Sequence, residues 1–144
     1  MIPCSWRFEL IEAWYPNTTW NQYGNQIEMI SDCEFFNGRK DYAHIGGCYY
    51  ASRMAVNELL LEQKRTAGVV IFREAHPGYV MPVGVWNVRE NVRAALKTKP
   101  FKYGTLEDAM KHIDRVMDIP RKVWINNSGI LKDFYTQRRI DDFF

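Results

Sequence analysis

The fold class is inferred first from a stretch near the start of the chain, Trp6-Arg7-Phe8-Glu9-Leu10-Ile11-Glu12. Apolar and charged side chains alternate along it, and this period of two is typical of a strand with one buried face. It therefore predicts a half-buried β-strand. A second extended stretch is expected from about Gln26 to Phe36, between the turn signals Tyr23-Gly24-Asn25 and Asn37-Gly38.

Beyond these strands the apolar pattern changes to the helical period. A helix is expected from about Cys48 to Lys64, and then the run Val69-Val70-Ile71-Phe72 predicts a strand buried on both faces. Further helices are expected over residues 85–97, 106–117 and about 123–135, the second of them capped by Thr105. Strands precede helices without regular alternation, which favours an α+β fold: a small mixed or antiparallel sheet with packed helices.

The composition is that of one globular domain. The chain has 144 residues, 47% hydrophobic and 25% charged, which argues against long disorder. No stretch approaches the roughly 18 unbroken apolar residues of a membrane span, and Met1-Ile2-Pro3-Cys4 lacks the segments of a signal peptide. We therefore expect a cytoplasmic protein without a membrane partner, consisting of one domain over residues 1–135 and a tail over residues 136–144.

Cysteines and histidines give no sign of a metal site. The three cysteines, Cys4, Cys33 and Cys48, are widely spaced and odd in number, which suits a reducing compartment. The three histidines fall in no ligand spacing. Neither a metal nor a cofactor is expected.

The C-terminal tail carries the most specific pattern in the sequence. Residues 137–144 read Gln-Arg-Arg-Ile-Asp-Asp-Phe-Phe. In one helical turn Ile140, Phe143 and Phe144 would face the same way and form an apolar plug, with Gln137 one turn earlier. This is the pattern of the box that binds the sliding clamp of DNA replication (PCNA), the PIP-box. The alternative is that the tail packs onto its own domain.

A basic helix face is the second signal. Arg89, Arg93 and Lys97 are spaced at i, i+4 and i+8, Lys99 extends the run, and Trp86 lies on a neighbouring face. Cations in line suit phosphates and the indole could stack on a base. The alternative, which the sequence alone favours, is a solvated face with Glu90 paired to Arg93 and Trp86 in the core. The chain is basic only in its second half: residues 1–72 have six Lys or Arg against eight Asp or Glu, and residues 73–144 have thirteen against nine.

Weaker signals surround the third predicted strand. Arg73 and Glu74 end it, and with Glu90 they are the candidates for a catalytic pocket that Arg89 and Arg93 would also line. Gly46-Gly47 could expose N–H groups to a phosphate, and Cys48 beside them could have a lowered pKa, although a turn and a buried, inert thiol are the better interpretations.

Three segments together resemble a known family. They are Glu12-Ala13-Trp14-Tyr15-Pro16-Asn17-Thr18, Gly46-Gly47-Cys48-Tyr49-Tyr50-Ala51, and the run from Arg73-Glu74 through Pro77-Gly78-Tyr79 to Pro82-Val83-Gly84-Val85-Trp86-Asn87-Val88-Arg89-Glu90. Over residues 6–144 the chain is similar to the C-terminal domain of the archaeal Nre DNA-repair proteins, whose members tend to end in a clamp-binding box.

The resemblance implies a DNA-repair or damage-tolerance protein of the nucleoid, recruited to the sliding clamp by its tail and contacting DNA. It also implies a further partner, because family members have a preceding region with a zinc-binding cysteine cluster; this chain would be a fragment, part of a split protein, or a minimal form. Whether it is an enzyme stays open. The alternatives are a small enzyme acting on nucleic acid or nucleotides, and a structural domain whose tail completes its own core.

Overall fold

A computed structural model describes residues 1–79 and 84–137. The sheet has three strands, β1 (Arg7–Trp14), β2 (Glu28–Glu34) and β3 (Gly68–Ala75), in the order β2-β1-β3. β2 runs antiparallel to β1, whereas β3 runs parallel to it with Arg7 opposite Gly68 and Trp14 opposite Ala75. The mixed sheet with packed helices is the predicted α+β architecture.

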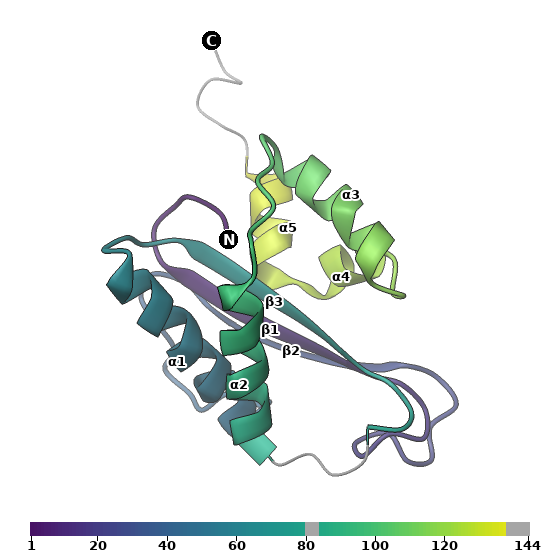
Figure 1. Ribbon diagram of the computed structural model, residues 1–144. Coiled ribbons are helices and arrows are strands. Elements are labelled where there is room, and N and C mark those ends of the chain that lie inside the picture. Colours follow the sequence, from purple (N-terminus) through teal and green to yellow (C-terminus); the bar gives the residue numbers. More distant parts are fainter. Residues whose placement is uncertain (80–83, 138–144) are drawn as a thin grey trace.

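Helices cover both faces of this sheet (Figure 1). One layer consists of α1 (Gly47–Glu62) and α2 (Gly84–Lys97), and the other of α3 (Leu106–Val116), α4 (Arg121–Asn127) and α5 (Gly129–Thr136). The first layer packs on a cluster that includes Phe8, Leu10, Tyr49, Val56 and Val69. The second packs on a cluster that includes Ile11, Ala13, Met110, Trp124 and Leu131. Within the described residues, no helix is both long and apolar enough to cross a membrane.

β1 is buried on both faces, so the prediction of a half-buried strand was wrong. Phe8 and Leu10 face α1 and α2, whereas Ile11 and Ala13 face the other layer. The charged residues of the alternating pattern are therefore inside: Glu9 is 1% exposed and Glu12 is 4% exposed. β3 is covered on both faces as predicted, with Ile71 in one cluster and Phe72 in the other. The side chains of residues 70–74 are nevertheless only partly buried, because β3 is an edge strand.

The buried Glu9 carboxylate caps α5 from across the sequence. It accepts hydrogen bonds from the backbone N–H of Gly129 at 2.8 Å and of Ile130 at 3.2 Å, and from the Ser128 hydroxyl. Ser128 in turn accepts from Leu131 N at 2.9 Å through its hydroxyl and from Lys132 N at 3.3 Å through its carbonyl. The N–H groups of Gly129, Ile130 and Leu131, which have no partner within the helix, are thus satisfied, and the bond from Lys132 is the first of the helix itself. Burial raises the pKa of the Glu9 carboxyl, and these hydrogen bonds oppose the rise.

The segment expected to be one helix over residues 123–135 is two helices. The chain turns at Ser128, whose backbone is extended, with φ −99° and ψ 125°. The turn frees the Ser128 hydroxyl to cap α5, as Ser commonly does at helix starts. The single predicted helix was wrong here because Asn126-Asn127-Ser128-Gly129 favours a break.

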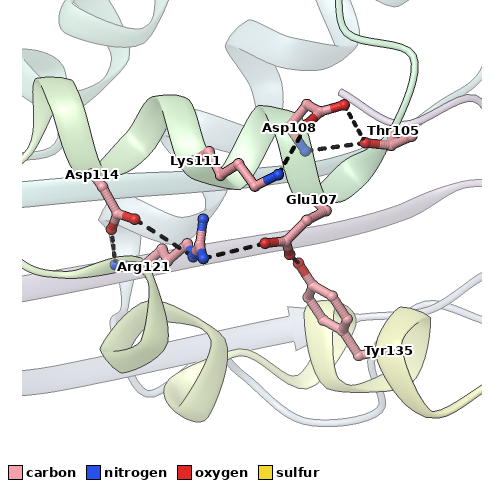
Figure 2. Close-up of polar contacts among 7 residues, drawn as sticks. All are labelled: Thr105, Glu107, Asp108, Lys111, Asp114, Arg121 and Tyr135. Carbon is pink, nitrogen blue, oxygen red and sulfur yellow. Dashed lines mark hydrogen bonds and ion pairs between the residues drawn. The ribbon is translucent and has the colours of Figure 1, made fainter.

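Polar side chains join the three helices of the second layer (Figure 2). The Glu107 carboxylate of α3 accepts a hydrogen bond from the Tyr135 hydroxyl of α5 at 3.2 Å and pairs with the Arg121 guanidinium of α4 at 3.2 Å. Asp114 accepts from the Arg121 backbone N–H at 2.7 Å. The predicted cap of α3 is confirmed, because the Thr105 hydroxyl accepts from Asp108 N at 3.1 Å. α5 is therefore held at its start by Glu9 and near its end by Glu107.

Replacing Glu9 by alanine should lower the free energy of unfolding by about 3 kcal/mol. The change leaves the N–H groups of Gly129 and Ile130 without their partner, and each unsatisfied buried donor costs about 1–3 kcal/mol. Urea unfolding followed by circular dichroism measures it. Glu28→Ala, at the exposed start of β2, is the control and should stay within about 0.5 kcal/mol of the natural protein. Equal losses in the two variants would contradict the capping role.

Candidate functional site

A buried ion pair lies near the carboxyl ends of the parallel strands β1 and β3. Arg73 lies opposite Glu12 in the register of β1 and β3, and its guanidinium is 2.9 Å from the Glu12 carboxylate. Both side chains are largely buried, with 16% of Arg73 and 5% of Glu12 exposed. The Trp14 indole N–H donates to the same carboxylate at 3.2 Å. The sequence singled out Arg73 but not its partner, since the register between two strands that are not consecutive in the sequence cannot be inferred from the pattern of either strand.

Aromatic rings cover the Arg73 guanidinium. Its carbon lies 5.1 Å from the ring centre of Trp14 and 5.4 Å from that of Tyr79, both within cation–π range. With one carboxylate and two rings as neighbours, Arg73 is committed to partners within the domain. The arrangement therefore joins the strand ends and the segment that follows β3.

Cys48, in the first turn of α1, is not an activated thiol. Burial raises its pKa, the Glu12 carboxylate raises it further, and Arg73 opposes that rise. A raised pKa keeps the sulfur protonated near neutral pH, and the thiol is a poor nucleophile. The inert interpretation of Cys48 thus agrees with its surroundings.

The structure does not bring the three catalytic candidates into one pocket. Successive residues of a strand point to opposite faces, so Arg73 meets Glu12 while Glu74 turns to the other layer. There its carboxylate accepts from the N–H of Ile119 at 2.8 Å and of Asp118 at 3.3 Å. Glu90 lies on α2 and pairs with arginines of that helix. The expectation of a shared charged pocket was therefore wrong in its geometry.

Glu74 is also part of a cluster that the sequence reasoning missed. The His76 ring lies with Nε2 3.4 Å from Glu74 and Nδ1 3.9 Å from Asp118, and it stacks on Tyr15 with ring centres 4.3 Å apart. One ligand atom from each of Glu74, His76 and Asp118 lies within 4.8 Å of the others, a spacing that could hold a metal ion. Asp118 is distant in sequence from Glu74 and His76, so no local sequence motif contains all three residues. The Glu74 carboxylate already binds two backbone N–H groups, which accounts for its position without an ion.

The arginines of the predicted basic face are paired with carboxylates. Arg93 contacts Glu58 of α1 with two nitrogens, at 2.8 and 2.6 Å, and Glu90 with a third at 2.7 Å. Hydrogen bonds from Arg93 hold the pKa of the Glu58 carboxyl below its usual value. Arg89 contacts Glu90 at 3.2 Å. The pairing of Glu90 with Arg93 expected for a solvated face is confirmed, and a contact between α1 and α2 is added.

The other members of that face are open to solvent. Trp86 is 57% exposed near the start of α2, so the prediction that it belongs to the core was wrong. Lys97 and Lys99 are exposed, and among residues 1–79 and 84–137 no carboxylate lies within ion-pair distance of either. Unneutralised positive charge is thus found beyond the paired arginines, where α2 ends.

Most of the predicted clamp-binding tail lies outside the described residues. Ile140, Phe143 and Phe144 belong to residues 138–144, which the structure does not describe. Gln137 is described: it follows α5 directly, and its backbone N–H donates to the Asp133 carbonyl at 2.8 Å. The tail therefore begins where the last helix ends.

Comparison with known proteins gives a consistent result. Residues 34–143 match the family model described as "Archaeal Nre, C-terminal". The chain is 41% identical over 132 residues to DNA repair protein NreB of Archaeoglobus fulgidus, covering 92% of this chain and 34% of that protein. It is 36% identical to DNA repair protein NreA of the same organism, over 86% of this chain and 31% of that protein. It is 33% identical to DNA repair protein NreA of Haloferax volcanii, over 83% of this chain and 29% of that protein. The chain thus spans about a third of the length of these curated relatives. No solved structure gives a significant match.

Breaking the buried ion pair should destabilise the domain strongly. Arg73→Met leaves the Glu12 carboxylate buried without a cation, and we expect a loss of about 3 kcal/mol in the free energy of unfolding. Adding Glu12→Gln to Arg73→Met should recover much of that loss. Arg93→Met, in the more exposed network between α1 and α2, should cost much less, because ion pairs close to solvent contribute little to stability. Urea titration of the four proteins measures these differences, and equal effects of the two arginine variants would contradict the assignment of Arg73 as a buried structural charge.

Proposed function

Since the chain belongs to the archaeal Nre family, we propose that it acts in DNA repair, held at the replication sliding clamp by its C-terminal tail. The curated relatives are named DNA repair proteins. The proposed role of this chain is recruitment to the clamp and contact with nucleic acid at the nucleoid. A separate N-terminal region of the same family, carrying zinc, is a further proposed partner.

The tail sequence is the observation that carries the proposal. Gln137, Ile140, Phe143 and Phe144 have the spacing of a clamp-binding box. Burying the three apolar side chains in a clamp pocket would contribute roughly 1.5–3 kcal/mol each. Ordering the segment and losing translational freedom would offset much of this. The expected net affinity is about micromolar, near −8 kcal/mol.

The position of α5 supports the same proposal. Glu9 holds the start of this helix and Glu107 holds Tyr135 near its end. Gln137 therefore has a defined place directly after α5, and a clamp bound to the tail would be kept close to the body of the protein. This geometry supports a tether that also limits where the domain can reach on the DNA.

The charge distribution supports the nucleic-acid contact. Residues 97–104 read Lys-Thr-Lys-Pro-Phe-Lys-Tyr-Gly, with three lysines and no acidic residue. Phosphates attract such a segment, because neutralising them releases bound counterions. Lys97 and Lys99 are the proposed phosphate contacts, whereas Arg89 and Arg93 first have to exchange a carboxylate partner.

Removing the two terminal rings should abolish clamp binding. Isothermal titration of the full chain with the clamp of its own organism should give a dissociation constant of about 1 μM, and Phe143→Ala with Phe144→Ala should leave no measurable heat, because aromatic anchors dominate such contacts. Arg138→Ala, at an unconstrained position of the box, is the control and should bind nearly as the natural chain does.

A thermal melt of the double alanine variant distinguishes the tether from the structural alternative. An unchanged melting temperature is expected. A large fall would show that these rings complete the domain's own core, and unchanged clamp affinity would refute the tether.

A further inference from the structure

The segment between α2 and α3 exposes two aromatic rings. It runs from the end of α2 on one face of the sheet to the start of α3 on the other (Figure 1). Phe101 is 74% exposed and Tyr103 is 41% exposed. A phenylalanine ring left so far in water loses most of the free energy it would gain by burial, and its surface is open to a partner.

The two rings are positioned by one side chain of α3. The His112 ring centre lies 4.7 Å from that of Phe101 and 5.7 Å from that of Tyr103, with ring planes inclined at 40° and 39°. His112 is itself only partly exposed. Contact with a helix residue holds the rings of the segment while leaving most of the Phe101 surface free. We call Phe101, Tyr103 and His112 the aromatic platform.

Lysines alternate with these rings. Lys99 and Lys102 flank Phe101 in the sequence, Lys97 ends α2, and all three are exposed. Across the described ranges no carboxylate is within ion-pair distance of any of them, in contrast to Arg93, which binds two. The open positive charge of this region therefore surrounds the platform.

We propose that the aromatic platform, with Lys99 and Lys102, binds single-stranded nucleic acid by stacking an unpaired base on Phe101. This rests on the nucleic-acid contact in the proposed function and deepens it by naming the ligand class. Unpaired bases expose the flat faces that aromatic side chains bind, and lysines beside the rings neutralise the phosphates of the same strand. Bases inside a duplex stack on each other, so a duplex would meet only the lysines.

The charge pattern favours this ligand over a protein partner. An apolar docking face for a protein has few charges at its centre, whereas here lysines stand on either side of the main ring. The platform also lies near the start of the tail: α3 begins at Leu106, and its Glu107 contacts Tyr135 of α5. A strand bound there would lie close to a clamp that holds the tail.

Fluorescence anisotropy of the full chain tests the proposal. The probes are a labelled oligothymidylate of about 16 nucleotides, within the usual range of site sizes, and a hairpin duplex of the same number of nucleotides. The natural chain should bind the single strand more tightly. Phe101→Ala should weaken that binding about tenfold, and Phe101→Trp should retain it. Lys99→Glu with Lys102→Glu should weaken binding and flatten its dependence on salt.

Two controls keep the outcome specific. Phe36 is 73% exposed beyond the end of β2, so Phe36→Ala removes an equally exposed ring and should leave the affinity unchanged. The variant with Phe143→Ala and Phe144→Ala should bind the single strand normally, so failure of the clamp proposal and failure of this one are distinguishable. Thermal melts of all variants should agree with the natural chain.

Three results would overturn the assignment. The first is equal affinity of Phe101→Ala and Phe36→Ala for the single strand. The second is that the natural chain binds the duplex as tightly as the single strand and that Phe101→Ala weakens both to the same extent. The third is a loss of clamp affinity, with single-strand affinity unchanged, when Phe101 is replaced, which would make the platform a protein contact.

Discussion

The buried carboxylate of Glu9 connects the first strand of the domain to its last helix. It supplies partners to two N–H groups and one hydroxyl at the start of α5. A carboxylate buried in a central strand would be costly without such partners, and a helix of 8 residues would be marginal without tertiary support. Each feature therefore makes the other possible. The position of α5, and with it that of Gln137 directly after the helix, depends on this interaction.

Charged residues inside the sheet also explain where sequence reasoning succeeded and failed. The α+β class and the helices beginning near residues 47, 84 and 106 follow from apolar period and the Thr105 cap, which are local properties. The alternation of apolar and charged residues in β1 predicts one solvent-exposed face, because the sequence pattern cannot distinguish a charged side chain in water from one that is buried and bound to a distant residue. Glu9 pairs with residues 119 to 121 positions later, and Glu12 with one 61 positions later. Contacts between residues so far apart in the sequence cannot be inferred from a local sequence pattern.

The candidate site was predictable to the same extent. The sequence identified Arg73, Glu90, Arg93 and Lys97 as charged residues of interest, but only their surroundings separate those engaged within the domain from those open to solvent. Arg73 and Arg93 bind carboxylates of other elements, so their charge is used in holding the domain together. Lys97, Lys99 and Lys102 remain exposed. The open charge therefore lies around the segment between α2 and α3, with the aromatic platform among it.

The domain needs residues that precede the family match. The match begins at residue 34, where β2 ends, and so it omits the central strand β1 on which both helical layers pack. The alignment with NreB covers 132 residues and extends over most of the chain. Residues from Arg7 onward thus belong to the folded unit.

Hydrogen exchange followed by mass spectrometry, with and without the sliding clamp, tests most directly whether this unit is a rigid body joined to the clamp by its tail. The tether predicts that saturating clamp slows amide exchange in peptides covering residues 138–144 and leaves exchange in peptides of β1, α1 and β3 unchanged. Protection spread over the sheet and α1, or no protection of the last residues, would contradict it.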